Sequence, residues 1–335
     1  MKGIENVTAV AAKVEVAGTC VGRFEPVRAA FLDNLDTGQD IGAAVAVFVD
    51  GEPVVDLWGG HFDGTYTRPF GSDTIVQCFS STKTVTALCA LDRERSTALL
   101  ARQAPLWTPG RTSGYHCYTL GHLVGEVVRR ITGKTLGTFL REDVAGPLGA
   151  GDDFHIGTPA DCDPRVSLLI QGARHDHGIG RRIPDLTLHN PHVTPQDTWA
   201  LPWRRAELGA MNGHGNARGI ATLQSVLACG EANGVKVLSD AARERVLEQQ
   251  SDGPDLVLGV PCRWGLGYSL ETSIFPGVSA DARIAWWGGN GGSMAFVDLD
   301  ARMAVGFTPN RWISGPHEQT RSRRLIAAAY ESLAR

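Results

Sequence analysis

Residues 76–90 of this 335-residue chain read VQCFSSTKTVTALCA, and they contain the pattern on which the prediction of fold and function depends. The stretch opens with β-branched and aromatic residues and continues into an apolar, Thr-rich segment that predicts a helix. Between the two lies the pattern Ser80-x-x-Lys83. If Ser80 stands at the start of the helix, Lys83 follows one turn later on the same face.

This pattern has a chemical and a structural interpretation. A serine hydroxyl is a poor nucleophile until a base stands beside it, and an amine whose pKa is lowered by burial can be that base. The N-terminus of a helix would also favour the negative charge that develops during attack. Alternatively, Ser80 is a helix N-cap and Lys83 is a solvated side chain. The four residues alone do not decide between these interpretations.

Composition places the chain among ordinary globular proteins. Apolar residues make up 43% of it and charged residues 20%, and its length suits one large domain or a domain with a second lobe. The net charge is -4 with no basic block, so we expect no nucleic acid partner. No apolar run reaches the length of a membrane span, so we expect none.

The cysteines and the first residues favour a cytoplasmic location. The seven cysteines are odd in number, irregularly spaced and without a Cys-x-x-Cys pair, so we expect reduced thiols. Residues 1–6 include an early acid and lead into no sustained apolar core, so we expect no secretory signal.

Two kinds of periodicity divide the chain into elements. Apolar residues at helical spacing predict helices at 22–38, 81–92, 94–104, 119–132, 135–145, 217–229, 239–249 and 317–334. Apolar β-forming runs predict strands at 43–49, 53–58, 283–287, 293–298 and 303–307. The first two strands flank Asp50-Gly51, which is a strong hairpin signal. Between about 150 and 210 we expect long loops with short helices that form a wall of a substrate site.

This order of elements is typical of an α+β protein. Strands lie near both ends of the chain and do not alternate with helices as in a βαβ fold. We therefore expect both ends to contribute to one antiparallel sheet flanked by helices, and the middle of the chain to form a helical lobe.

Two further stretches carry residues suited to acyl transfer. Gly114-Tyr115-His116-Cys117 precedes the helix predicted at 119–132. A phenol at this junction could move protons beside the nucleophile, and flanking cations would favour a phenolate. Residues 286–293 read WWGGNGGS. Glycines on a strand let a ligand approach the backbone and free N–H groups for an oxyanion.

With Ser80-x-x-Lys83, Tyr115 and the Gly-Gly strand in this order, the chain resembles the serine β-lactamase-like superfamily. The likeness is greatest to the family VIII carboxylesterases, which are related to class C β-lactamases and D-alanyl-D-alanine peptidases. Matching segments run through nearly the whole chain, at 54–60, 80–88, 114–116, 123–127, 145–149, 212–215 and 287–289. The resemblance implies one β-lactamase/transpeptidase-like unit over residues 1–335, with an α/β lobe at about 1–80 and 215–335 and a helical and loop lobe at about 81–214.

The same resemblance implies roles for individual residues. Ser80 matches the acylated nucleophile, Lys83 its base or proton shuttle, and Tyr115 the tyrosine that moves protons to the leaving group. Which of Lys83 and Tyr115 is the base stays open. The backbone N–H groups of Ser80 and Asn290 would form the oxyanion hole. No metal and no cofactor is implied, and the substrate would contact Trp287, Gly288, Gly289 and His116.

Two departures from the family pattern bear on the substrate. β-Lactamases and peptidases of the superfamily have Lys where this chain has Trp287, and the lysine charge helps to hold the substrate carboxylate. Such a charge-assisted contact contributes about 1.5–3 kcal/mol, so its loss argues against penicillins, cephalosporins and peptidoglycan stems. Cys117 replaces an Asn that would hold a substrate amide. Both changes favour neutral, apolar acyl esters.

The segment between Lys83 and Tyr115 is short, at 31 residues, where relatives usually carry a longer helical insert. We therefore expect a shortened helical lobe and a more open site. A partner subunit in a possible homo-oligomer could complete that site, or the activity could be impaired.

Other candidate sites have structural interpretations. Residues 291–295 nearly match a Gly-x-Ser-x-Gly elbow, but a strand follows the turn, so we interpret Ser293 as structural. We expect His214 to be a hydrogen-bonded turn residue beside glycines that need positive φ, although it could face the site. His116 could tune the phenol or face outward. Four tryptophans are expected in the core or in cleft walls, at 58, 264, 286 and 312. A possible metal cluster matches no zinc spacing, and its members would be His175, Asp176, His177, His189 and His192.

The sequence thus predicts a serine esterase of the EC 3.1.1 type that hydrolyses short- to medium-chain carboxylic esters through an acyl-enzyme on Ser80. One alternative is a β-lactamase or a D-amino-acid peptidase or amidase. Another is an acyltransferase that uses the same acyl-enzyme, and the last is a catalytically silent binding protein. The expected partner is a small-molecule ester.

Overall fold

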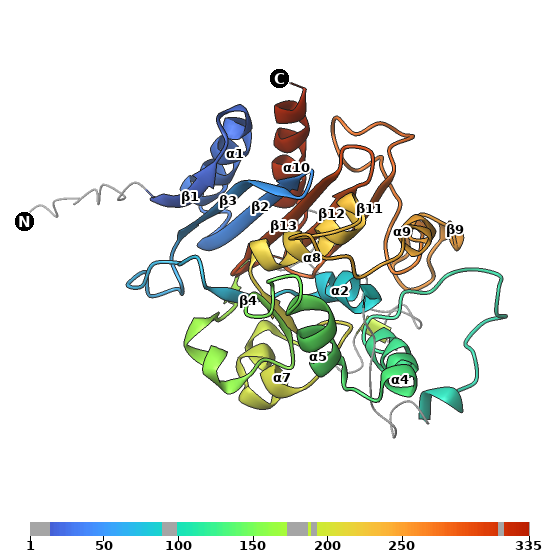
Figure 1. Ribbon diagram of the computed structural model, residues 1–335. Coiled ribbons are helices and arrows are strands. Elements are labelled where there is room, and N and C mark those ends of the chain that lie inside the picture. The colour runs from blue at the N-terminus through green and yellow to red at the C-terminus, as the bar shows by residue number, and fades with distance from the viewer. Residues whose placement is uncertain (1–13, 89–98, 173–186, 189–192, 314–317, 335) are drawn as a thin grey trace, which may run out of the picture.

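The computed structural model describes residues 14–88, 99–172, 187–188, 193–313 and 318–334. Its main sheet has six strands in the order β1-β3-β2-β13-β12-β11, and each neighbouring pair is antiparallel. The sheet draws strands from both ends of the chain, as the order of elements predicts (Figure 1). Its strands are β1 (Val16–Cys20), β2 (Gly42–Val49), β3 (Glu52–Gly60), β11 (Ile284–Gly288), β12 (Met294–Asp298) and β13 (Met303–Pro309).

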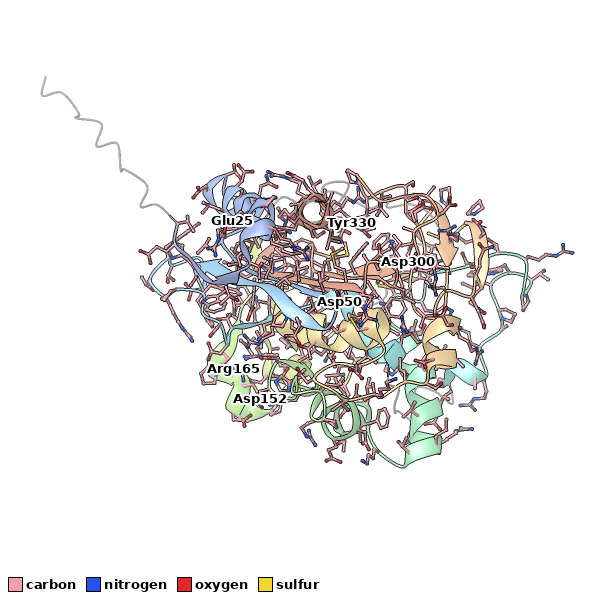
Figure 2. All side chains as sticks on the ribbon, turned by 45° about the horizontal axis from the view of Figure 1, so that its top comes forward. Glu25, Asp50, Asp152, Arg165, Asp300 and Tyr330 are labelled. Carbon is pink, nitrogen blue, oxygen red and sulfur yellow. The ribbon has the colours of Figure 1, made fainter. Side chains whose placement is uncertain are left out.

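Helices cover both faces of this sheet. α1 (Glu25–Asp36) and α10 (Thr320–Leu333) pack against each other on one face, and α8 (Ala217–Cys229) crosses β2, β12 and β13 on the other (Figure 1). All eight residues of β2 are buried, because neither face of this central strand meets water. Apolar side chains fill the space on both sides of the sheet (Figure 2).

The hairpin between β2 and β3 follows directly from the local sequence. Asp50 and Gly51 both have positive φ, at 53° and 82°. Tight two-residue hairpin turns need positive φ at both positions, and Asp-Gly supplies it at low cost. The hairpin predicted from these two residues is confirmed.

A second sheet of four short strands, in the order β5-β8-β4-β6, leads into α2 (Thr82–Leu88). α2 contacts α8 and also α4 (Leu120–Thr132). The strands are β4 (Ile75–Gln77), β5 (Phe154–Ile156), β6 (Val166–Ser167) and β8 (Gly213–Gly215).

The remaining elements are α5 (Leu136–Phe139), a π-helix (Leu140–Ala145), α7 (Leu201–Arg205), α9 (Asp240–Arg245), β7 (Ile170–Gln171), β9 (Ser251–Pro254), β10 (Pro261–Trp264), β14 (Arg311–Trp312), and 3-10 turns at Gly22–Phe24, Phe79–Ser81, Ala160–Arg165 and Pro195–Trp199.

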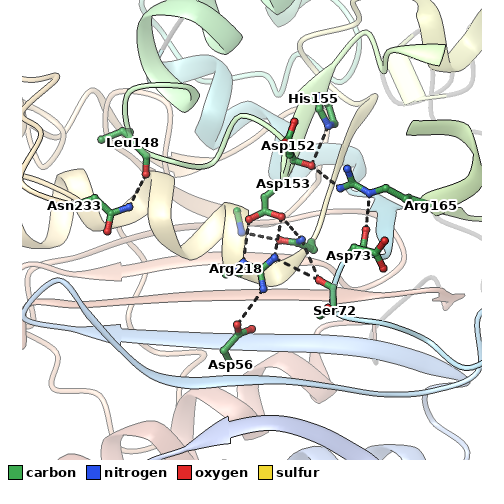
Figure 3. A network of polar contacts seen from close by, with 12 residues as sticks. Asp56, Ser72, Asp73, Leu148, Asp152, Asp153, His155, Arg165, Arg218 and Asn233 are labelled. Carbon is green, nitrogen blue, oxygen red and sulfur yellow. Dashed lines mark hydrogen bonds and ion pairs between the residues drawn. The ribbon is translucent and has the colours of Figure 1, made fainter. Parts of the chain in front are cut away.

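An ion-pair network joins the small sheet to the large one (Figure 3). Arg218, in the first turn of α8, contacts Asp56 on β3 at 3.1 Å and Asp153, just before β5, at 3.0 Å. Asn216 also donates to Asp153, at 2.7 Å. These contacts hold the N-terminal end of α8 between the two sheets.

Most predicted helices are confirmed, at 22–38, 119–132, 135–145, 217–229 and 317–334, with differences of a few residues at their ends. The helix predicted at 239–249 is shorter, because the chain leaves α9 after Arg245 and enters β9 at Ser251. Of the helices predicted at 81–92 and 94–104, residues 89–98 lie outside the described part of the chain. Strands in the 150–210 stretch were missed, because two or three residues are too few to show a period.

The α+β fold class is as predicted, with an antiparallel sheet flanked by helices. Within the described residues, no helix has both the length and the hydropathy needed to cross a membrane.

Candidate active site

Ser80 lies on a sharp turn between β4 and α2. It is the middle residue of the 3-10 turn Phe79–Ser81, and α2 begins two residues later at Thr82. Phe79 has a φ of 43°, a region that residues with side chains adopt rarely. Backbone strain of this kind persists where the surrounding packing enforces it, and Phe79 is buried in the core. The expected position of Ser80 at the start of a helix is confirmed.

Two side chains reach the Ser80 hydroxyl. Lys83 Nζ lies 3.2 Å from Ser80 Oγ, and the Tyr115 hydroxyl donates to the same oxygen at 2.7 Å. Lys83 Nζ also stands 4.8 Å from the centre of the Tyr115 ring. The three residues that the sequence analysis singled out therefore form one hydrogen-bonded group.

Lys83 is buried and has neutral neighbours. Its Nζ donates to the carbonyl oxygens of Cys117, at 3.0 Å, and of Ala210, at 2.6 Å, in addition to Ser80 Oγ. Burial lowers the pKa of Lys83 to about 8, because the ammonium ion loses its hydration. A useful fraction of this amine is therefore unprotonated near neutral pH, as a general base requires.

The burial of Tyr115 works against the phenolate that flanking cations would favour. Burial raises the pKa of its phenol, and this desolvation outweighs the hydrogen bonds with Ser80 and Trp287, which lower the pKa. The hydroxyl is held from both sides, since Trp287 Nε1 donates to it at 3.0 Å while it donates to Ser80 Oγ. The phenol thus stays protonated and can pass a proton on, whereas Lys83 is the group with a lowered pKa.

Asp255 holds the backbone of the Tyr115 loop, and the sequence analysis missed it. Its Oδ1 accepts hydrogen bonds from the N–H groups of Tyr115, Val257 and Leu258 at 3.0–3.1 Å. Its Oδ2 accepts from Ser113 Oγ at 3.0 Å. Asp255 is far from Tyr115 in the sequence and belongs to no motif, so only the folded chain reveals the contact.

The glycine-rich turn after β11 packs closely behind Ser80. A Cβ on Gly289 would stand 2.1 Å from the carbonyl oxygen of Cys78, so this position tolerates no side chain. Ser293 Oγ donates to the same carbonyl at 2.6 Å and lies 3.0 Å from Ser81 Oγ. β12 begins at Met294, directly after this turn, so the structural interpretation of Ser293 is confirmed.

Two backbone N–H groups remain candidates for an oxyanion hole. Ser80 lies in the first turn of a helix, where N–H groups have no partner within the helix. Asn290 is exposed in the turn that follows β11.

A cleft of about 310 Å³ opens beside Lys83 and Tyr115. Its walls are mainly apolar and aromatic, and Trp264 stacks on Tyr115 with the ring centres 6.1 Å apart. α4 supplies another part of the wall through Leu120, Leu123 and Val124. Gly288 and Gly289, predicted to bind substrate, are not among the described residues that line this cleft, whereas Trp287 and His116 are.

The histidines considered as candidate site residues fall into three groups. His116 Nδ1 lies 2.7 Å from Thr119 Oγ1, and burial lowers the pKa of His116. His214 is buried in β8 with its Nδ1 2.9 Å from the Asn212 carbonyl, and burial lowers its pKa to about 3. The positions of the proposed metal cluster, 175–177, 189 and 192, lie outside the described residues. In the part that is described, no group of three or more potential metal ligands occurs.

The glycines beside His214 were expected to need positive φ, and this expectation was wrong. Gly213 and Gly215 belong to a strand and do not have positive φ. They are glycines because a Cβ at either position would clash with the Phe154 ring, at 2.6 and 2.3 Å. Close packing, not turn conformation, excludes a side chain here.

The tryptophans are placed as expected. Trp286 and Trp312 are buried, Trp58 packs on the core beneath the sheet, and Trp264 lines the cleft.

Comparison with known proteins gives consistent matches. The sequence matches the beta-lactamase family model over residues 27–99 and 90–330. Esterase/beta-lactamase LipL of Mycobacterium tuberculosis is 27% identical over 375 residues, covering 89% of this chain and 84% of LipL. A family VIII carboxylesterase crystal structure is similar with a TM-score of 0.86 and 31% identity, covering 95% of this chain and 100% of that chain. A penicillin-binding protein homologue from Caulobacter crescentus has a TM-score of 0.82 and 30% identity, with coverage of 95% and 100%.

The family model matches this chain in two parts that overlap at residues 90–99. The alignment with LipL extends over 375 residues, more than the 335 residues of this chain, so LipL carries residues that have no counterpart here. Because the family match nevertheless accounts for most of the sequence, this chain belongs to the beta-lactamase family, with its transpeptidase-like fold, and is a serine hydrolase.

Proposed function

We propose that this serine hydrolase is an esterase that cleaves neutral, short- to medium-chain carboxylic esters through an acyl-enzyme on Ser80. The observation that carries the proposal is the position of Trp287. Its indole donates to the Tyr115 hydroxyl and forms part of the cleft wall, where a cation would be needed to hold a substrate carboxylate. Lys83 is the one lysine or arginine among the described residues of the cleft wall, and it is committed to Ser80 and two carbonyls.

In the proposed reaction, unprotonated Lys83 accepts the Ser80 proton while Ser80 Oγ attacks the ester carbonyl carbon. The carbonyl oxygen becomes an oxyanion that accepts hydrogen bonds from the Ser80 and Asn290 N–H groups. When the C–O bond to the alcohol breaks, the Tyr115 phenol gives its proton to the leaving oxygen, and the Lys83 ammonium restores that proton. A water molecule then attacks the acyl-enzyme with the same groups exchanging the same protons, which releases the acid and frees Ser80.

The apolar cleft supports an acyl or alkoxy group without charge. Leu123, Val124 and Trp264 offer apolar contact area, and each buried methylene of a substrate contributes about 0.8 kcal/mol. The relatives named above include a carboxylesterase and an esterase/beta-lactamase, which is consistent with ester chemistry on this scaffold.

The test compares an ester with a β-lactam on the same protein. We expect hydrolysis of p-nitrophenyl butyrate, slow hydrolysis of a chromogenic cephalosporin, and an acyl adduct on Ser80 found by mass spectrometry after acid quenching. Ser80→Ala should abolish both turnover and adduct while leaving the circular dichroism spectrum unchanged. Rapid cephalosporin hydrolysis would overturn the ester preference, and ester turnover by Ser80→Ala would overturn the assignment of the nucleophile.

Trp287→Lys tests the role given to the indole. It restores the charge that the family pattern has at this position, so cephalosporin turnover relative to butyrate turnover should rise by about tenfold or more. Trp287→Phe is the matched control, because it also loses the hydrogen bond to Tyr115 but adds no charge. An equal rise in both variants would show that the charge is not what excludes the β-lactam.

A further inference from the structure

Two side chains at the start of α10 form hydrogen bonds with the turn that contains Asn290. Gln319 Nε2 donates to the Gly289 carbonyl at 3.2 Å, and Arg321 donates to the Gly291 carbonyl. The two carbonyls belong to the residues on either side of Asn290. Both side chains are buried, and neither was identified from the sequence.

The first of these contacts determines how the Asn290 amide is oriented. The Gly289 carbonyl and the Asn290 N–H belong to one planar trans peptide group, in which C=O and N–H point in opposite directions. Gly289 O accepts from Gln319 Nε2 and, at 2.9 Å, from the Gly292 N–H. These donors lie on one side of the peptide, so the Asn290 N–H is directed to the other.

The Gln319 side chain is itself held in one orientation. Ser322 Oγ lies 3.0 Å from the Gln319 backbone carbonyl oxygen and 3.1 Å from Gln319 Oε1, so the amide oxygen lies toward Ser322 and Nε2 faces Gly289. Gly288 lies against this side chain, and a Cβ on Gly288 would stand 2.4 Å from Gln319 Nε2. The close approach of Gln319 is therefore one reason why position 288 is a glycine.

Arg321 holds the other side of the turn by a buried ion pair. It pairs with Asp40 and also donates to the Arg311 carbonyl at 3.1 Å. A Cβ on Gly292 would stand 2.3 Å from Arg321 Nη2, so the turn closes directly onto the guanidinium. The turn is thus fixed at both carbonyls before any substrate binds.

We infer that Gln319 is a positioning residue for the oxyanion hole, which orients the Asn290 N–H through the Gly289 carbonyl. This inference rests on the proposed function, in which that N–H stabilises the tetrahedral intermediate. Gln319 touches neither Ser80 nor the cleft, so it acts through the peptide group alone. A preorganised donor is worth more in the transition state than in the bound substrate, so its misorientation lowers kcat more than it raises KM.

The first variant removes the hydrogen bond at constant size. For Gln319→Met, we expect kcat for p-nitrophenyl butyrate to fall by about tenfold to hundredfold, with KM within about twofold. Gln319→Glu should do at least as much harm, because a carboxylate oxygen would face the Gly289 oxygen. Arg324→Gln is the matched control on the same helix, since it removes a surface contact to Asp33 of α1 and should leave kcat unchanged. A wild-type kcat in Gln319→Met would overturn the inference.

A second measurement separates positioning from a general loss of structure. Phenylboronic acid adds to Ser80 when Ser80 Oγ bonds to boron, the serine proton passes to Lys83, and the now tetrahedral boron carries the negative charge. Its Kd, read from inhibition of butyrate turnover, should rise in Gln319→Met by about the factor by which kcat/KM falls. Inhibition by butyrate ion, which forms no tetrahedral adduct, should not change.

The two proposals fail in different ways. A wild-type protein that neither hydrolyses the ester nor binds the boronic acid would overturn the proposed function, and the inference about Gln319 with it. A wild-type protein that does both, together with a Gln319→Met variant that binds the boronic acid equally tightly, would overturn the inference alone.

Discussion

α8 and α4 are both 13 residues long and both contact α2, the helix that follows Ser80, yet they pack in opposite ways. α8 buries all but two of its residues between the two sheets. α4 buries three, namely Gly121, Gly125 and Glu126, while Val127 is 55% and Ile131 76% exposed. Apolar periodicity therefore produced one core helix and one helix whose apolar stripe faces the cleft and the solvent.

The difference follows from what each helix meets. α8 lies under a broad apolar sheet and presents Ile220, Leu223 and Val226 to a closed core. α4 approaches its neighbours through its glycines, and a Cβ on Gly121 would stand 2.5 Å from the backbone nitrogen of Ala210. Small residues permit close backbone contact, so the apolar side of α4 is left to line the cleft through Leu120, Leu123 and Val124. Periodicity predicts a helix, but it does not say which face a neighbour will cover.

The largest effect on stability should come from α8. Leu223→Ala removes a fully buried side chain from the core, and large-to-small changes of this kind cost about 2–5 kcal/mol of unfolding free energy. Urea denaturation followed by circular dichroism measures the loss. A cost below about 1 kcal/mol would mean that the α8 core is less tightly packed than its burial indicates.

Gly121→Ala tests the side of α4 that packs against the backbone of residues 209–210. The added Cβ would force the backbone at 209–210 to move, and the Ala210 carbonyl accepts a hydrogen bond from Lys83. Because small displacements of catalytic groups are costly, we expect kcat/KM for an ester substrate to fall by about tenfold to hundredfold. Gly22→Ala is the control, since a Cβ there meets no atom within 4 Å. Equal activity in both variants would contradict the contact as described.

The dependence of kcat/KM on pH tests the role of Lys83, which lies on α2. In the proposed reaction the unprotonated form of Lys83 is the base, and burial lowers the pKa of Lys83 to about 8. Raising the pH removes the proton, so kcat/KM should increase by about tenfold per pH unit below pH 8 and level off above it. Steady-state rates in constant ionic strength buffers give the profile. A rate that falls as the pH rises through 8 would instead require the lysine cation, and Lys83 would not be the base.

The smallest effect should come from the exposed side of α4. Ile131→Ser replaces an exposed side chain outside the cleft, so the free energy of unfolding should change by no more than about 0.5 kcal/mol. Urea denaturation at two protein concentrations measures it. A loss above about 1.5 kcal/mol that grows with protein concentration would show that a second copy covers this face in solution.

Local sequence was enough for the parts of the protein that depend on neighbours in the chain. Asp50-Gly51 determined the β2–β3 hairpin because few other dipeptides adopt positive φ twice. Ser80 and Lys83 lie on the same side of the chain because they are one turn apart, and this spacing lets Lys83 Nζ reach Ser80 Oγ at 3.2 Å. The glycines at 288, 289, 291 and 292 indicated a site where the backbone itself is exposed to close approach.

Tertiary structure decided what depends on burial and on residues distant in the sequence. Which of Lys83 and Tyr115 is the base stayed open in the sequence, because burial, which raises the pKa of Tyr115 and lowers that of Lys83, cannot be read from residue spacing. Asp255 supports Tyr115 from 140 positions away, and Gln319 reaches Gly289 from 30 positions away. The sequence by itself determined the turn and the helix that carry Ser80 and Lys83, because these depend on short-range geometry. Only the folded chain decided the proton states and the supports of the site, because desolvation and long-range hydrogen bonds exist only after packing.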